Sequence, residues 1–148
     1  MHSTPSQDNL DHYEPLAVRP DDLDRCTLAG GERSTVLHIA PISMLTQRHL
    51  PDAARARGIG MVSLDPGERT MQPQLRPHIE DVLTRIDVFM PSDQEVRGLL
   101  PDSTQAFDPF ACARWFAQRG PRYVVIKLGS RGALVYERDS DSAWRVPA

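Results

Sequence analysis

The sequence predicts one α/β domain built around a mostly parallel sheet, and two features of its 148 residues indicate this class. From Thr35 onward, short apolar runs alternate with segments in which apolar residues recur at helical spacing. The segment from Tyr123 to Leu128 is a continuous apolar run, as expected of a strand that helices cover on both faces. Repeated alternation of strand and helix favours a parallel sheet with right-handed crossovers.

Six strands are expected in chain order. Their apolar runs occupy residues 36–39, 59–64, 86–90, 123–128, 133–136 and 144–146. The first four runs alternate with helical segments and therefore belong to the parallel part of the sheet. The last two follow a turn from Gly129 to Gly132, which indicates a pair of strands at one edge.

Two helices are expected from apolar stripes. The first stripe lies within residues 75–83, where Pro77 is acceptable only in the first turn of the helix. The second stripe lies within residues 110–117, and Gly120 with Pro121 ends that helix.

Residues 1–34 are expected to form an acidic, proline-containing, loosely ordered leader ahead of a partial domain at residues 35–148. Up to Asp24 the leader carries six acidic residues and one arginine, and it has few large apolar residues. We assign no function to this segment.

Composition argues against several classes of function. The 17 basic and 20 acidic residues leave a formal charge of −3, which predicts no nucleic-acid or anionic-membrane partner. No stretch approaches the ~18 apolar residues of a membrane helix, and the chain starts without a signal-peptide core, so a cytoplasmic protein is expected. Cys26 and Cys112 lie far apart without a CxxC motif, which predicts neither a disulfide framework nor structural zinc.

Three clusters of polar residues and glycines follow predicted strands. They are Asp-Pro-Gly-Glu-Arg at 65–69, Pro-Ser-Asp-Gln-Glu at 91–95 and Lys-Leu-Gly-Ser-Arg-Gly at 127–132. Ligands of open α/β sheets bind at the carboxyl ends of the strands, so these clusters form the candidate site. Asp65 and Arg69 suit a phosphate or a sugar hydroxyl, because arginine offers a planar fork of donors.

Each cluster also has a purely structural explanation. The first fits an ordinary Asx turn. Ser92 and Glu95 have the spacing of a helix capping box. Gly129 and Gly132 permit a strained turn as readily as they let the backbone approach a ligand. The residues by themselves leave both explanations open.

Taken together and in this order, the clusters resemble the central portion of a ribokinase-like (PfkB) carbohydrate kinase. The likeness runs from about Val36 to Ala148 and rests on the segments SLDPGER, IDVFMPSDQEVRGLLPD and YVVIKLGSRGALVYERDSDSAWRVPA. It implies a three-layer, Rossmann-like, mostly parallel sheet that is truncated at both ends. It further implies transfer of a phosphoryl group from ATP, with Mg²⁺, to a hydroxyl of a sugar or nucleoside-like substrate.

The resemblance also implies roles for individual residues. Positions near the substrate or phosphate are Asp65 and Arg69, and positions at the nucleotide are Ser92, Glu95, Lys127, Gly129 and Gly132. Glu95 would act on the metal through water. Two positions depart from the family pattern: Gly67 stands where Asn is common, and Ser92 replaces the Asn of the element that tunes magnesium binding.

Two signatures of the family are missing from the sequence. One is the glycine-rich sugar-binding signature, and the other is Gly-Ala-Gly-Asp, which supplies an anion hole and a base. The segment from Arg145 to Ala148 resembles the approach to the second signature. We therefore expect a fragment that is inactive alone, and we assign no catalytic residue.

Two other interpretations remain open. The chain is then either a non-catalytic remnant that keeps a nucleotide-binding surface, or an unrelated α/β module whose clusters are turns and caps. For a truncated kinase domain, we expect the sheet surface that the missing amino-terminal part leaves uncovered to favour homo-oligomers or other self-association.

Overall fold

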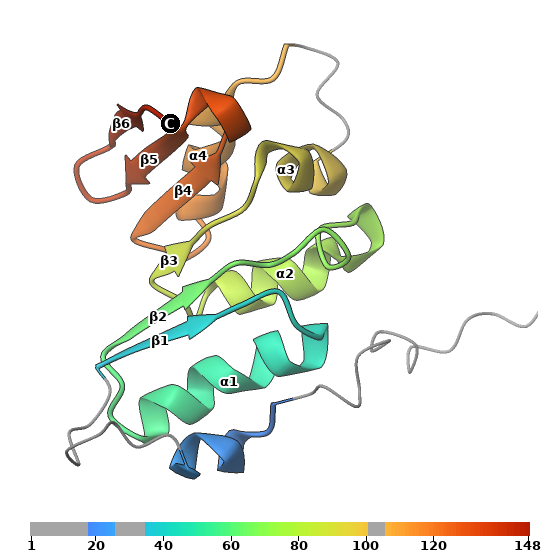
Figure 1. The fold of residues 1–148 in the computed structure, drawn as a ribbon, viewed down its shortest axis with the longest axis vertical. Coiled ribbons are helices and arrows are strands. Elements are labelled where there is room, and N and C mark those ends of the chain that lie inside the picture. The colour runs from blue at the N-terminus through green and yellow to red at the C-terminus, as the bar shows by residue number, and fades with distance from the viewer. Residues whose placement is uncertain (1–17, 26–34, 101–105) are drawn as a thin grey trace, which may run out of the picture.

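The structure is a computed structural model that describes residues 18–25, 35–100 and 106–148. Expectations for most of the leader, and for Cys26, therefore lie outside the described residues. The 3-10 helix η3, Pro20–Arg25, contacts helix α1 (Figure 1). Arg57 follows α1 and donates two hydrogen bonds to the Asp24 carboxylate, at 2.6 and 3.0 Å, and these bonds lower the pKa of Asp24.

Six strands form one mixed sheet in the order β1 to β6 (Figure 1). Their bounds are β1 Val36–Ile39, β2 Met61–Leu64, β3 Val88–Phe89, β4 Tyr123–Lys127, β5 Ala133–Glu137 and β6 Ser142–Val146. Strands β1 to β4 run parallel, and β5 and β6 add two antiparallel pairings at one edge. The expected α/β class, the mostly parallel sheet and the edge pair are confirmed.

Three strands are shorter than expected, β2, β3 and, by one residue, β4, and Asp87 explains part of the difference. Its carboxylate accepts a hydrogen bond from the backbone N–H of Val62 at 2.7 Å, a donor that a longer β3 would pair through its backbone. Arg55 also donates to this carboxylate, at 2.5 Å. The parallel ladder between β2 and β3 is therefore limited to two register pairs, which begin at Ser63 and Val88.

Four α-helices accompany the sheet. They are α1 Met44–Ala56, α2 Arg76–Leu83, α3 Asp93–Leu99 and α4 Pro109–Ala117. The two apolar stripes correspond to α2 and α4, and Pro77 lies in the first turn of α2 as expected. Helix α1 has no counterpart among the predicted stripes; it begins at an N-cap in which Ser43 Oγ accepts from the N–H of Thr46.

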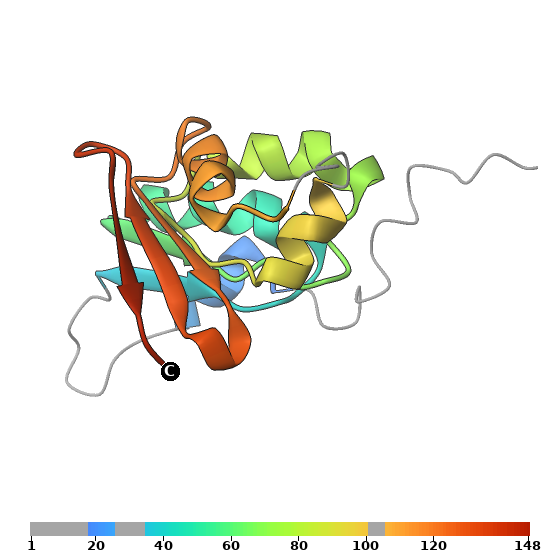
Figure 2. The same cartoon turned by 90° about the horizontal axis from the view of Figure 1, so that it is seen from above.

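Helices α1, α2 and α4 lie on the same side of the sheet (Figure 2). This arrangement follows from the strand order, because right-handed crossovers between consecutive neighbouring parallel strands all pass over the same face. On β4, the side chains of Val124 and Ile126 are fully buried toward the helices, whereas Val125 is only partly buried. Within the described residues β4 is therefore covered on one face, and two of the three implied layers are present.

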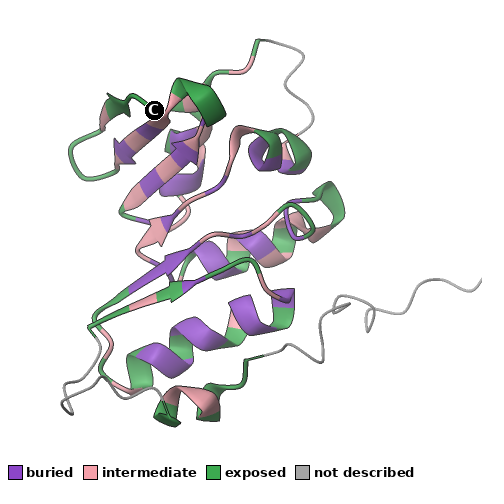
Figure 3. Ribbon diagram, viewed as in Figure 1, coloured by how far each residue is buried: buried purple, intermediate pink, exposed green. Residues whose placement is uncertain are grey.

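The core fills the space between this face and the helices (Figure 3). Phe89 of β3 and Phe116 of α4 are both fully buried, with ring centroids 5.0 Å apart. Tyr136 of β5 meets Phe110 of α4 edge-on at 5.6 Å. Aromatic pairs of this kind hold α4 against the middle and the antiparallel edge of the sheet.

Candidate functional site

The carboxyl ends of β2, β3 and β4 meet at one edge of the sheet, because the three strands are parallel neighbours. Asp65 follows β2 directly, Ser92 precedes α3 after β3, and Lys127 is the last residue of β4. The structure thus brings the three predicted clusters to one place, and direct contacts connect them.

An ion pair joins the first and third clusters. Lys127 Nζ lies 2.5 Å from Asp65 Oδ2, and both side chains are partly exposed, at 39% and 22%. Asp65 Oδ1 is buried and has no hydrogen-bond partner among the described residues. One carboxylate oxygen thus holds the lysine, while the other remains available to a donor or a cation. Lys127 is also the single lysine of the chain.

The second cluster caps helix α3 and pairs with β4. Ser92 Oγ accepts from the N–H of Glu95 at 3.2 Å, and Glu95 Oε2 accepts from the N–H of Ser92 at 2.6 Å. This reciprocal pair is a complete capping box, with Glu95 buried. Ser92 also forms a parallel bridge with Lys127, whose N–H donates to the carbonyl of Pro91 at 2.9 Å. Capping accounts for Ser92 and Glu95 structurally, and their action on a metal stays a prediction.

The glycines of the third cluster differ in their surroundings. Gly132 has φ +81°, and a Cβ there would lie 1.9 Å from the carbonyl oxygen of Val146, so the approach of β6 requires glycine. Gly129, in the short helix η5 (Gly129–Arg131), has φ +60° and open space where its side chain would lie. Gly129 therefore leaves room beside the backbone that a ligand can use, whereas the fold by itself explains Gly132.

A second ion pair connects α3 to η5. Arg131 donates to the carboxylate of Asp93 at 2.9 Å, in the first turn of α3. Asp93 and Arg131 are not among the site residues predicted from the sequence. Their positions could have indicated a role at the site, because each residue lies inside a cluster that directly follows a strand.

The turn after Asp65 is fixed mainly from α1. Gln47 is fully buried and donates from Nε2 to the carbonyl of Pro66 at 2.8 Å, and Thr70 Oγ1 donates to the same carbonyl at 2.5 Å. Gly67 has φ +79°, and a Cβ at this position would lie 2.7 Å from a side-chain carbon of Pro41. This close approach explains glycine at the position where Asn is common.

Arg69 was predicted as a site residue from the sequence, whereas Gln47 was not. Arg69 lies exposed on the turn that follows Asp65, so its approach to a phosphate or hydroxyl stays a prediction. Gln47 positions that turn but was not predicted, because nothing in the local sequence pattern distinguishes a buried glutamine, and helix α1 itself was not predicted.

The donor set of this edge fits Mg²⁺ only as a water-bridged ion. Among the described residues, no group of three or more His, Cys, Asp or Glu side chains is placed to hold a metal. Mg²⁺ typically keeps several waters and uses one or two carboxylates together with substrate phosphates. The unpaired oxygen of Asp65 and the carboxylate of Glu95 are compatible with that pattern.

Comparison with solved structures identifies the fold of this chain. A PfkB protein from Polaromonas sp. JS666 is 32% identical, with a TM-score of 0.60 over 77% of this chain and 40% of that chain. A putative ribokinase II from E. coli, in complex with ATP and Mg²⁺, is 25% identical with a TM-score of 0.60 over 88% and 41%. This chain contains a partial ribokinase-like domain of the PfkB type.

The expected relation to PfkB carbohydrate kinases is thereby confirmed. A Burkholderia thailandensis nucleoside kinase in complex with inosine shares the ribokinase-like fold at 16% identity, with a TM-score of 0.57 over 77% and 34%. The chain spans about 40% of the length of the first two solved structures. No protein-family model and no curated protein matches it. Of the helices in the described ranges, none has the length and apolarity to cross a membrane.

Proposed function

We propose that this ribokinase-like chain contributes the nucleotide-facing edge of an ATP-dependent kinase that phosphorylates a hydroxyl of a sugar or nucleoside-like substrate. The observation that carries the proposal is the contact network that joins all three clusters at the carboxyl edge of the sheet. Asp65 pairs with Lys127, and Ser92 bridges to the same lysine. An edge of this kind is where open α/β sheets bind ligands.

The three clusters would contribute to nucleotide binding in different ways. Lys127 supplies a positive charge for the phosphates, released from or shared with Asp65. Gly129 and its neighbours let the backbone approach the nucleotide. Glu95 holds the water shell of Mg²⁺ while it caps α3. ATP and Mg²⁺ bound to the related ribokinase II support the choice of cofactors.

The 148-residue polypeptide by itself is expected to bind nucleotide weakly and to transfer no phosphoryl group. Its sequence contains no Gly-Ala-Gly-Asp signature, and phosphoryl transfer depends on positioning and charge stabilisation by such groups. A coupled assay over pentoses, hexoses and nucleosides should detect no sugar-dependent release of ADP. Saturable turnover by homogeneous protein would contradict this expectation.

Nucleotide binding can be tested through the single lysine. Reductive ¹³C-methylation labels Lys127 and the terminal amine and keeps the charge of the lysine. Titration with ATP should shift the Lys127 methyl signal with a Kd near ~1 mM, because one lysine and a turn give only weak affinity. Lys127→Arg identifies the signal by removing it. No shift at about ten times that concentration would overturn the proposal and favour the unrelated module.

A second variant separates the metal role of Glu95 from its capping role. Glu95→Gln preserves the capping box, since glutamine also accepts from the N-cap N–H, but it removes the negative charge. We expect the ATP-induced shift to lose most of its Mg²⁺ dependence in Glu95→Gln. The control Asp139→Asn changes a carboxylate at the far end of β5 and should leave that dependence unchanged. Equal Mg²⁺ dependence in all three proteins would assign Glu95 to capping alone.

A further inference from the structure

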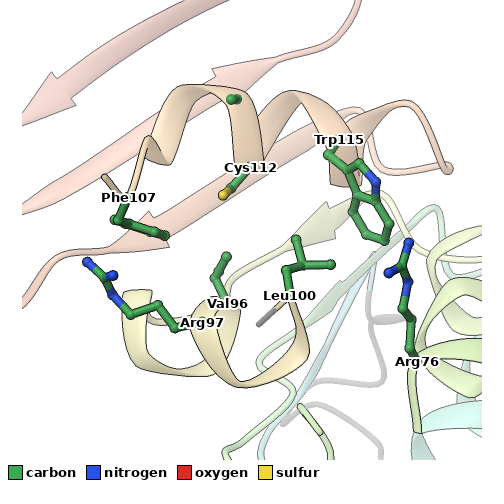
Figure 4. A pocket seen from close by; sticks show the side chains of 8 residues that line it. Arg76, Val96, Arg97, Leu100, Phe107, Cys112 and Trp115 are labelled. Carbon is green, nitrogen blue, oxygen red and sulfur yellow. The ribbon is translucent and has the colours of Figure 1, made fainter. Parts of the chain in front are cut away.

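A pocket of about 270 Å³ lies between α3 and α4, away from the sheet edge just described (Figure 4). Helix α3 begins at the sheet edge with Ser92, but the pocket lies at its opposite end, around Arg97 and Leu100. Seven helical residues span about 10 Å, so the two places share a helix without sharing a surface.

The walls of this pocket are mostly apolar. Val96 lines it from α3 and Leu100 from the C-cap of that helix, and Cys112 faces them from α4 (Figure 4). Phe107 stands at one end and Trp115 at the other. The space is thus a slot between two helices with aromatic side chains at both ends. A flat apolar body fills such a slot with less void than a bulky aliphatic group, and voids forfeit contact energy.

The charges at the two ends differ. At the Trp115 end, Arg76 and Arg119 lie over the indole ring, at 4.8 and 3.4 Å from its centroid. Both also approach Glu80, at 2.8 and 3.7 Å, so a single carboxylate offsets only part of the charge of the two arginines. Of the two arginines only Arg76 lines the slot, and it makes the closer contact with Glu80.

At the other end, Arg97 stacks over the ring of Phe107 at 4.1 Å from its centroid. Within residues 18–25, 35–100 and 106–148, the Arg97 guanidinium forms no ion pair with a carboxylate. The nearby acid Asp108 uses its carboxylate to cap α4, where it accepts from the N–H of Phe110 at 2.9 Å. An apolar slot in which the described residues leave Arg97 without a carboxylate partner matches a ligand with one negative charge.

We propose that this slot binds a small aromatic monocarboxylate, with its ring between α3 and α4 and its carboxylate paired with Arg97. The volume restricts the ligand to a single ring with a short chain, because pockets for drug-sized molecules occupy about 300–1,000 Å³. A second negative charge in the slot would meet only Arg76, which already pairs with Glu80 at 2.8 Å, because Arg119 does not line the slot. The inference is independent of the proposed kinase function.

Cys112 provides the readout, because its thiol lines the slot (Figure 4). The chain has two cysteines, so Cys26→Ser leaves Cys112 as the single thiol. Burial raises the pKa of Cys112, so alkylation by iodoacetamide is measured at about pH 8.5, where enough thiolate forms. The probe is 3-phenylpropanoate, compared with the neutral 3-phenylpropanamide and the aliphatic hexanoate.

The expected result is protection of Cys112 by the aromatic carboxylate. At ten times Kd, mass action fills about 90% of the sites, so alkylation should slow about tenfold. Arg97→Gln should raise Kd by about tenfold or more, because it removes a charge-assisted hydrogen bond. Arg97→Lys keeps the charge without the planar fork and should weaken binding less. Arg114→Gln changes an arginine of α4, the helix that carries Cys112, but Arg114 pairs with Asp141 at 3.3 Å, so this variant should bind like the parent.

Three outcomes would overturn the proposal. The first is no protection by 3-phenylpropanoate at about 20 mM, well above the ~1 mM expected for so small a ligand. The second is equal protection by the amide, which would show that the carboxylate is not recognised, or by hexanoate, which would show that the ring is not recognised. The third is an unchanged Kd in an Arg97→Gln protein whose circular dichroism and thermal midpoint match those of the parent.

Discussion

The two faces of the sheet contrast sharply, although both are rich in apolar residues. The helix-side residues Val124, Ile126 and Phe89 are fully buried under the helices. On the opposite face, large apolar side chains are 40–50% exposed: Val36, Met61, Trp144 and Val146. The difference arises from topology, since consecutive right-handed crossovers cover only one side. The covered face supplies the stability of the domain, and the other face supplies surface for contacts.

The same contrast locates the candidate site. Lys127 lies two residues beyond Val125 on β4, so its side chain shares the uncovered face, and Asp65 reaches it there. A ligand at the sheet edge can therefore reach this ion pair without displacing a helix. The core on the covered face remains separate from the chemistry.

The largest expected effect is on the covered face. Phe116→Ala removes a fully buried ring that packs against Phe89 and Trp115, each with centroids 5.0 Å away. We expect the free energy of unfolding to fall by about 3–5 kcal/mol. Urea denaturation followed by circular dichroism measures this loss. A loss below about 1 kcal/mol would show that the covered face is not the main source of stability.

A matched pair on β4 compares the two faces directly. Val124→Ala and Val125→Ala are the same substitution at adjacent residues that point to opposite sides. The first should lower the free energy of unfolding by about 2 kcal/mol and the second by less than about 1 kcal/mol, since Val125 is only partly buried. Equal losses in urea denaturation would mean that something also covers the second face.

Self-association tests what the exposed face does in solution. Sedimentation velocity of the chain at about 100 µM should show species heavier than the 16.6 kDa monomer, because exposed apolar side chains and edge strands promote association. Trp144→Glu should shift the population toward monomer. Leu45→Glu, an exposed apolar position on α1, serves as the control and should not. A parent protein that sediments as a monomer would contradict this prediction.

The smallest expected effect is on the pH dependence of stability, and it arises from Glu137 on the exposed face. Hydrogen bonds from Ser140, Tyr123 and Arg122 lower the pKa of Glu137 below its ordinary value of 4.5. The carboxylate of Glu137 therefore binds a proton more readily in the unfolded chain than in the folded one. Its contribution to the free energy of unfolding is present above about pH 4.5 and is lost as the pH falls through the lower pKa of the folded state. Acid should therefore weaken the fold partly through this residue.

Substitution at this carboxylate isolates its contribution. Glu137→Gln should reduce the difference between the unfolding free energies measured at about pH 6 and about pH 3.5, and Ser140→Ala should reduce it less. Asp24, whose pKa is also lowered, contributes with the same sign in every variant and cancels from the comparison. An unchanged pH dependence in Glu137→Gln would exclude the assigned role.

The sequence indicated the parallel core well but not which faces the helices would cover. The run from Tyr123 to Leu128 predicts a strand because apolar residues occupy both of its sides. That same pattern suggested helices on both faces, since nothing in the sequence distinguishes the partly buried Val125 from its fully buried neighbours. Coverage depends on the order of the strands, which local patterns do not contain.

Helix α1 and the contacts within the site could not be predicted from local sequence patterns either. Pro51 lies inside α1, and prolines in helix interiors usually argue against a helix. Tertiary packing overrides this local signal, because Met44, Leu50 and Ala54 are buried against the sheet. Cluster positions after the strands were predictable, whereas the specific pairing of Asp65 with Lys127 needed the register of three strands.

The single lysine also makes the domain divisible at one peptide bond. A protease that cleaves after lysine would cut at Lys127, separating residues 1–127 from the hairpin at 128–148. Five register pairs between β4 and β5 would still hold the hairpin to the sheet without a covalent link. Because Lys127 must leave its strand before the protease can bind, the cleavage rate reports how often this edge opens. The two pieces then form a natural system for fragment complementation, in which the antiparallel edge can be exchanged, labelled or withheld.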